Sequence, residues 1–368
     1  MPGLSPGYSA NKKSSSMDKQ EQKKFFRALT RLRAFAVFGV VAFHLSKDSG
    51  SWVPFFRPIV YHGYLGVDLF FVLSGFIIHH IYSTKFSEKI SKSDYAGFIR
   101  NRFARIYPVH FLTLVIMLFY SNAAMLILHH APKDANAFSS SSIIASLLLV
   151  HGWFNIPTPN VPAWSVSAEW FAYLLYPCAA FCLSRSNNPA RAIIAVCSLV
   201  MIALIANDNP LLRICPEFAL GMICYDLHTN INFSRRIIRF SGLFVASLLV
   251  ASCYLVSGEH MELYAALFAV LITVLANEND ILGRFLATPI PVYFGEISYS
   301  IYMTHGPAWA LVKNIVRLRH IPVSSWFVMG FALIFIAVIA AAMFHYVELP
   351  ARKLLRSTRR TIIETQTT

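Results

Sequence analysis

Residues 63–82 read GYLGVDLFFVLSGFIIHHIY, a mostly apolar stretch in which Asp68 is the single acidic residue. A helix of this length is about 30 Å long, which matches the thickness of the hydrocarbon core of a bilayer. Similar stretches precede and follow it along the chain. The sequence therefore predicts a protein whose main solvent is lipid.

This stretch is one of eleven apolar segments along the chain, which lie at about 27–48, 63–82, 104–128, 141–154, 166–184, 190–206, 211–227, 239–257, 261–277, 293–315 and 324–347. The segment 141–154 is the shortest, at about 21 Å of helix, whereas a spanning helix needs about twenty residues. We therefore predict an all-α, polytopic integral membrane bundle. It has about ten transmembrane helices plus one short re-entrant or interfacial segment, 141–154.

The composition supports a membrane protein and shows how it is oriented. Hydrophobic residues make up 56% of the 368 residues and charged residues only 14%, about half the charged share of a soluble chain. The net charge is +14, and 13 of those units lie in residues 1–33, 83–105 and 347–368, beside apolar segments. The positive-inside rule then places both termini in the cytoplasm, which indicates a multi-pass protein of the cell inner membrane. Nucleic acid is not expected as a partner, because no soluble module is present to bind it.

The chain divides into three parts by composition. Residues 1–24 form a polar cytoplasmic tail, 25–352 the transmembrane domain, and 353–368 a basic cytoplasmic tail. The six cysteines are scattered through apolar segments without metal-binding spacing, so they are interpreted as small core residues and no metal is expected.

Ionisable residues inside apolar segments are costly, and they are the first candidates for function. Arg33 and His44 are eleven residues apart, so they share one helix face, with about 16 Å between them along the axis. Structural roles remain open for both, because Arg33 could extend to the membrane surface and His44 could hydrogen-bond between helices. An unpaired carboxylate would be costly in lipid, so Asp68 is expected to pair with His44 or with an arginine.

A third cluster, Arg102 and Arg105, lies at the expected start of the segment 104–128. Residues three apart on a helix point the same way, and a helix N-terminus with two arginines is a favourable phosphate site. Anchoring at the cytoplasmic surface is the alternative role, and it accounts for Arg100 better than for this pair.

Three features occur in this order along the chain: the Arg33 and His44 pair, Asp68 in its apolar segment, and the Arg102 and Arg105 pair. Together they resemble the acyltransferase 3 family of membrane O-acyltransferases. Two further motifs extend the resemblance: PAWSVSAE at 162–169 is similar to P-x-x-W-S-x-S-x-E, and GEISYSIYMTHGP at 295–307 is similar to G-x-I-S-Y-S-I-Y-x-x-H-x-P. EFALG at 217–221 and ELP at 348–350 also match, and the resemblance runs from about 25 to 352. At 304 this chain has Thr, where many members have Trp.

The resemblance implies transfer of an acyl group, usually acetyl, from cytoplasmic acyl-CoA to a hydroxyl of a sugar. The acceptor would be a polysaccharide, a lipid-linked oligosaccharide or a glycolipid. The expected catalytic residues are His44, Arg33 and Asp68, and Arg102 and Arg105 are expected to bind acetyl-CoA, the co-substrate. Trp164 and Glu169 follow a proline-rich loop that this topology places outside. One interior cavity is therefore expected to join the arginines to the outer side, with His44 at the junction. The expected acceptor-binding residues are Trp164, Ser165, Glu169, Ser298, Tyr299 and His305, of which His305 could instead handle a proton.

A transporter or flippase for a lipid-linked sugar is the alternative, in which the same buried charges line a pathway. No repeat symmetry or pair of broken helices is visible to favour it. The arginine clusters with His44 suit a polyanionic donor and a proton-transfer centre, and they favour the enzyme.

Overall fold

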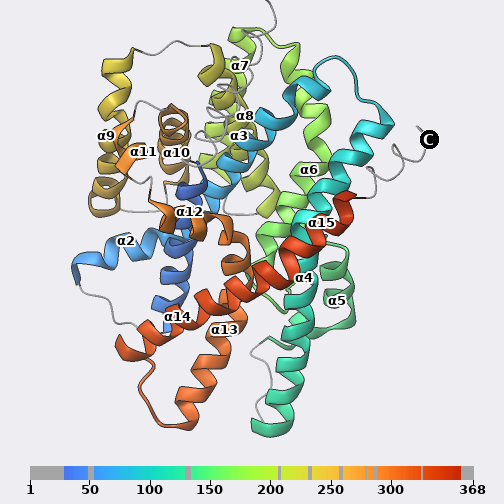
Figure 1. Cartoon of the computed structure of the whole chain (residues 1–368), viewed down its shortest axis with the longest axis vertical. Coiled ribbons are helices and arrows are strands. Elements are labelled where there is room, and N and C mark those ends of the chain that lie inside the picture. Colours follow the sequence, from blue (N-terminus) through green and yellow to red (C-terminus); the bar gives the residue numbers. More distant parts are fainter. Residues whose placement is uncertain are drawn as a thin grey trace, which may run out of the picture.

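The computed structural model describes residues 29–48, 54–128, 134–205, 209–230, 234–256, 260–277, 280–285, 288–324 and 326–357. Within these ranges every regular element is helical, as expected for an all-α bundle (Figure 1). The expected N-terminal tail, 1–24, lies outside the described residues, and so does most of the C-terminal one.

The chain begins with an N-terminal helix, Leu29–Asp48. The α-helices that follow are α2 (Arg57–Tyr61), α3 (Gly66–Phe86), α4 (Lys92–Leu128), α5 (Ser140–Leu147), α6 (Ala163–Ser184), α7 (Asn188–Ile205), α8 (Pro210–Asn230), α9 (Arg235–Leu255), α10 (Met261–Leu275), α11 (Ile281–Phe285), α12 (Pro289–Glu296), α13 (Ser298–Leu318), α14 (Trp326–Met343) and α15 (Leu349–Ser357). Short 3₁₀ turns join several of them, and a π-helical turn, Phe344–Glu348, joins α14 to α15.

Six stretches of the described chain are helical, long and apolar enough to cross a membrane: Leu29–Asp48, Pro54–Phe86, Lys92–Leu126, Ala163–Ser184, Ile237–Leu255 and Trp326–Leu355. They support a membrane protein, but they do not confirm the expected count of about ten. The expected segment 141–154 is covered by α5, which is eight residues or about 12 Å long, and by a 3₁₀ turn, His151–Trp153. Large apolar side chains such as Leu126, Leu255 and Phe327 are more than three-quarters exposed, as expected where lipid is the solvent.

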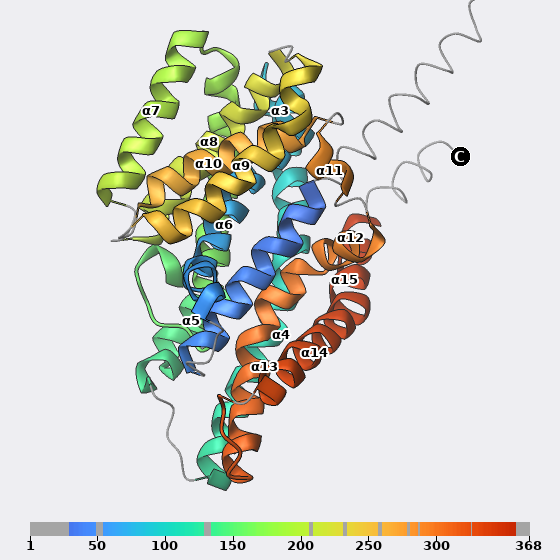
Figure 2. The same cartoon turned by 90° about the vertical axis from the view of Figure 1, so that its left-hand side faces the viewer.

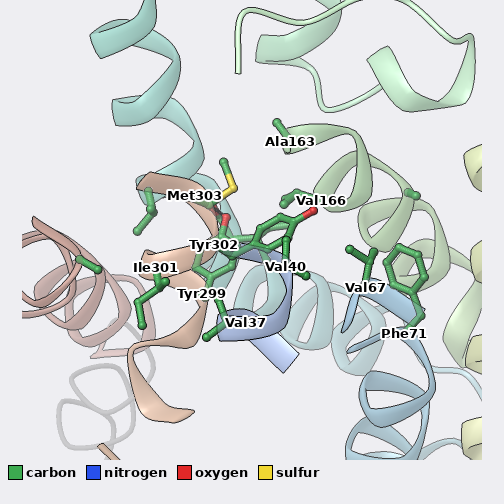
Figure 3. Packing of buried hydrophobic residues seen from close by; sticks show 14 of the residues in the cluster. Val37, Val40, Val67, Phe71, Ala163, Val166, Tyr299, Ile301, Tyr302 and Met303 are labelled. Atoms are coloured by element: carbon green, nitrogen blue, oxygen red, sulfur yellow. Dashed lines mark hydrogen bonds between the residues drawn. The ribbon is translucent and has the colours of Figure 1, made fainter. Parts of the chain in front are cut away.

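The helices form two groups on either side of the N-terminal helix (Figure 2). Helices α7 to α10 lie at one end of the molecule, and α13 and α14 lie at the other, where α13 packs along α14. The N-terminal helix, α3, α6 and α13 contribute side chains to one buried cluster (Figure 3): Val37, Val40, Val67, Phe71, Ala163, Val166, Tyr299, Ile301, Tyr302 and Met303. Segments far apart in the sequence therefore meet at the centre of the bundle.

Glycines allow a very close contact between α3 and α8. A Cβ atom added to Gly75 would lie 2.1 Å from the Phe218 carbonyl oxygen, and one added to Gly221 would lie 2.0 Å from the Val72 carbonyl oxygen. In lipid, close packing of this kind replaces the hydrophobic effect as the force between helices. Gly75 and Gly221 are therefore packing residues.

We expect Gly221→Ala to destabilise the protein by about 1–3 kcal/mol, because the new methyl group forces two backbones apart. The measurement is thermal unfolding in detergent. Gly330→Ala on α14 is the matched control, since a Cβ there meets nothing within 4 Å, and its melting temperature should stay the same or rise. Equal melting temperatures for the two variants would contradict the role of Gly221 in packing.

Candidate active site

Two adjoining cavities lie at the centre of the bundle, with empty volumes of about 430 and 480 Å³. Both are lined by Arg33, Phe70, Ser74, Glu169 and Tyr299. The first continues to Val67, Phe71, Ser165, Val166, Ser298 and Tyr302, and the second to Leu73, Ile77, Ile78, Arg102, Arg105, Ile106 and Tyr173. We call them the upper cavity and the arginine cavity. Their shared walls place the two cavities side by side.

The arginine cavity brings together the three arginines singled out from the sequence. Arg33 comes from the N-terminal helix, with its guanidinium 5.9 Å from the centre of the Phe70 ring. Arg102 lies 5.4 Å from the Tyr82 ring centre and donates to the Tyr82 hydroxyl at 3.4 Å. Arg105 donates to Glu348 at 2.8 Å. Three positive charges therefore converge on one cavity.

The position of the arginine pair within its helix differs from expectation. Helix α4 begins at Lys92, not near Arg102, because Ser91 and Asp94 cap it: the Asp94 amide donates to Ser91 Oγ at 3.1 Å. Residues 92–103 were left out of the apolar segment since they are largely polar, yet they form the first three turns. The expected help from a helix N-terminus is therefore wrong, and any anion here would meet side chains alone.

Two glutamates, Glu169 and Glu348, lie among these arginines and accept hydrogen bonds there. Glu169 Oε1 accepts hydrogen bonds from Ser74 at 2.7 Å and from Tyr173 at 2.5 Å. Glu348 accepts from Arg105, from Ser300 at 2.6 Å and from Arg352. Glu169 was expected on the opposite side from the arginines, but its side chain lines the same cavity.

The acceptor-binding residues expected from the sequence divide into two groups. Ser165, Ser298 and Tyr299 line the upper cavity, where Ser298 Oγ is buried with no partner among the described residues. Trp164 lines neither cavity, and its ring packs edge-on against Phe71. Tyr302 also lines the upper cavity, where its hydroxyl bonds to Ser165 at 2.8 Å and donates to the Pro162 carbonyl at 3.0 Å.

His44 and His305 lie together on the other side of Tyr302. Their ring centres are 5.0 Å apart, and the His305 ring centre is 5.8 Å from that of Tyr302. The Nδ1 atom of His44 lies 2.9 Å from the Val40 carbonyl oxygen, which can only accept a hydrogen bond, so in the neutral ring the proton is on Nδ1 and Nε2 is a base. His44 was expected to line a continuous cavity with the arginines, but it lines neither of these two.

Asp68 is held by a residue that sequence reasoning missed. Arg213 of α8 donates to both of its carboxylate oxygens, from Nε at 2.7 Å and from Nη2 at 2.6 Å. The Arg213 guanidinium lies 5.7 Å from the centre of the Trp164 ring. Asp68 therefore has the arginine partner that was expected, and both of its carboxylate oxygens accept hydrogen bonds from that arginine. The signal that could have pointed to Arg213 is its own position inside an apolar segment.

Comparison with known proteins gives this geometry a context. The model of a family described as an acyltransferase domain matches residues 26–346. The chain is similar to the O-acetyltransferase OatA of Staphylococcus aureus, at 25% identity over 92% of this chain and 59% of that protein. It is similar to the acyltransferase MdmB of Streptomyces mycarofaciens, at 28% identity over 89% and 92%. A third relative, the peptidoglycan O-acetyltransferase OatA of Listeria monocytogenes, is 24% identical over 90% and 56%.

The chain thus spans about three-fifths of the length of the OatA proteins. No solved structure matches it.

Proposed function

The chain belongs to the acyltransferase 3 family of membrane proteins, and we propose that it transfers an acetyl group from acetyl-CoA to a hydroxyl of a sugar. The sugar would belong to a polysaccharide, a lipid-linked oligosaccharide or a glycolipid. The observation that supports this proposal best is the placement of three arginines in one cavity, beside a second cavity whose wall residue Tyr302 packs against the imidazole pair.

The arginine cavity suits the nucleotide end of acetyl-CoA. CoA carries phosphate groups, and guanidinium groups bind phosphate through paired N–H donors. Arg102 is the arginine best suited to accept such a ligand, because within the described residues it contacts aromatic rings and a tyrosine hydroxyl and pairs with no carboxylate. Arg33 and Arg105 add charge on the neighbouring walls, and Glu169 and Glu348 fix the hydroxyl groups around them.

The upper cavity suits the pantetheine arm and the thioester. It is lined by Val67, Phe70, Phe71, Val166 and Tyr302, with hydroxyl groups between them, and it would join the arginine cavity in one passage. We propose that the thioester reaches the end of this passage while the nucleotide stays among the arginines. Ser165, Ser298 and Tyr299 would then contact the donor arm or the reacting groups, and Trp164 would shape the wall through Phe71 and Arg213.

His44 is the proposed general base. Its free Nε2 atom can take the proton of an acceptor hydroxyl as the oxygen attacks the thioester carbon. His44 is half-buried and lies next to the end of the N-terminal helix at Asp48, so an acceptor can approach it from the side opposite the arginines. The positive-inside pattern supports arginines at the cytoplasmic face of the inner membrane and cytoplasmic termini. Asp68 would contribute through Arg213, by fixing α3 against α8.

The test uses the purified chain in lipid nanodiscs with acetyl-CoA labelled in its acetyl group. We expect saturable binding of acetyl-CoA, competed by CoA, and release of the CoA thiol as label moves to water or to a glycolipid fraction. A transporter or flippase would bind or move a lipid-linked sugar without consuming acetyl-CoA. Absence of both acetyl-CoA binding and thiol release would therefore overturn the proposal.

A further inference from the structure

His305 shares the local geometry that makes His44 a base. Its Nδ1 atom lies 2.6 Å from the carbonyl oxygen of Tyr302 on its own helix, α13. A carbonyl can only accept, so in the neutral ring Nδ1 holds the proton and Nε2 is a free base. That Nε2 atom is buried and has no hydrogen-bond partner among the described residues, while the whole residue is only 1% exposed. A buried polar atom left without a partner requires an explanation.

The two imidazoles form a sequence from the donor cavity outward. Tyr302 is a wall of the upper cavity, His305 packs against Tyr302, and His44 packs against His305. His305 is enclosed, whereas His44 is half-buried. His305 is therefore the imidazole nearer the thioester sulfur, and His44 is the one nearer the acceptor.

Charged groups near His44 and His305 are paired with one another, so the two imidazoles are the groups that can carry the transferred proton. Lys47 and Asp48 are on the helix of His44, and Lys313 faces them from α13. The Asp48 carboxylate accepts from Lys313 at 2.6 Å and from Trp309 Nε1 at 2.8 Å. The Asp48 carboxylate is thus bound to a lysine and a tryptophan, and the Nδ1 atoms of both histidines contact backbone carbonyl oxygens.

From this geometry we propose that His305 is the second catalytic residue of the transfer and delivers a proton to the departing thiolate. The inference rests on the proposed acetyl transfer. The acceptor O–H bond breaks as its proton moves to His44, and the new O–C bond forms. The C–S bond breaks, the proton passes from His44 to His305, and the CoA sulfur takes it. The products are an acetyl ester and the CoA thiol, with no other reactant, and no thiolate is left bare in a low-dielectric interior.

The test compares two replacements of His305 in nanodiscs supplied with labelled acetyl-CoA. His305→Asn keeps an N–H that can donate to the Tyr302 carbonyl but has no base, and His305→Gln places an amide where Nε2 lies. We expect both to lower release of the CoA thiol about 10²–10⁴-fold, the usual loss for one proton-transferring group. Acetyl-CoA affinity should be unchanged. In His305→Ala, added imidazole should restore turnover and pyrrole, which has the same ring size but no basic nitrogen, should not.

His110→Asn is the matched control for burying an amide in place of an imidazole. His110 is also 1% exposed, and its Nε2 lies 2.8 Å from the Ser146 carbonyl oxygen, away from both cavities. That variant is expected to lose stability and keep its turnover. Near-wild-type turnover by His305→Asn, or equal rescue by imidazole and pyrrole, would reduce His305 to a structural residue. A wild-type chain that neither binds nor consumes acetyl-CoA would overturn the proposed function, and this inference with it.

Discussion

Replacing His44 with alanine is expected to reduce acetyl transfer about 10²–10⁴-fold while the affinity for acetyl-CoA stays the same. The reason is the position of the residue. His44 lies beyond Tyr302 and outside the arginine cavity, so its loss removes a base without removing a phosphate contact. The measurement is the initial rate of CoA thiol release by the chain in nanodiscs, together with acetyl-CoA binding by the same sample.

His62 supplies a closely matched control for His44. Its Nδ1 lies 2.8 Å from the carbonyl oxygen of Pro58, four residues back, as that of His44 lies 2.9 Å from Val40, and both side chains are half-buried. His62→Ala therefore loses the same local hydrogen bond but should keep wild-type turnover. If His44→Ala transfers acetyl as fast as His62→Ala, then His44 is not the base and its role is to pack against His305.

Helical periodicity predicted which faces carry the arginines, and the structure agrees with that prediction. Arg102 and Arg105 were expected on one face of one helix, and both line the arginine cavity together with Arg33. This result follows from spacing alone, because the positions of side chains on one helix are fixed by its pitch. The acyltransferase motifs added the second half of the site, since Ser298, Tyr299 and His305 come from a helix more than 180 residues farther along.

Contacts between helices were harder to predict, because periodicity within a segment does not say which segment packs against it. Asp68 was known to need a partner, but Arg213 is 145 residues away on α8, and only the close approach of α3 and α8 brings the two together. The same limit applies to Glu169. Its place after a proline-rich loop indicated the outer side, whereas its side chain extends to Ser74 in the arginine cavity.

The number of spans is ambiguous for a related reason. Helix α10 has fifteen residues, and α8 contains Arg213, Glu217 and Asp226, so neither fits a test based on length and hydropathy. Neighbouring helices, and not lipid, surround parts of these two helices. Glu217 on α8 and Ile272 on α10 are both completely buried. A segment that passes through the middle of a bundle does not need the composition of one that faces hydrocarbon. A count of spans based on length and hydropathy therefore leaves out such helices.

Replacing both Arg102 and Arg105 with alanine is expected to weaken acetyl-CoA binding about 10²–10⁴-fold, since a hydrogen bond to a charged group contributes about 1.5–3 kcal/mol. Arg102→Ala is the cleaner of the two single changes. Arg105 also pairs with Glu348, but Glu348 keeps Ser300 and Arg352 as partners when Arg105 is removed. Lysine at 102 should recover only part of the affinity, because it lacks the paired donors of a guanidinium.

The binding experiment distinguishes a phosphate site from an anchor at the membrane surface. Arg100 lies on the same helix and lines neither cavity, so Arg100→Ala removes one positive charge, as each single variant does, without touching the proposed ligand. Isothermal titration with acetyl-CoA, repeated at rising salt, should give weaker binding at high salt for the wild type and Arg100→Ala, and little salt dependence for the double variant. Dephospho-CoA, which lacks one phosphate, should lose less affinity on mutation than CoA itself. If the double variant binds acetyl-CoA as tightly as Arg100→Ala does, the arginine cavity is not the donor site, and the charges at 102 and 105 serve membrane orientation alone.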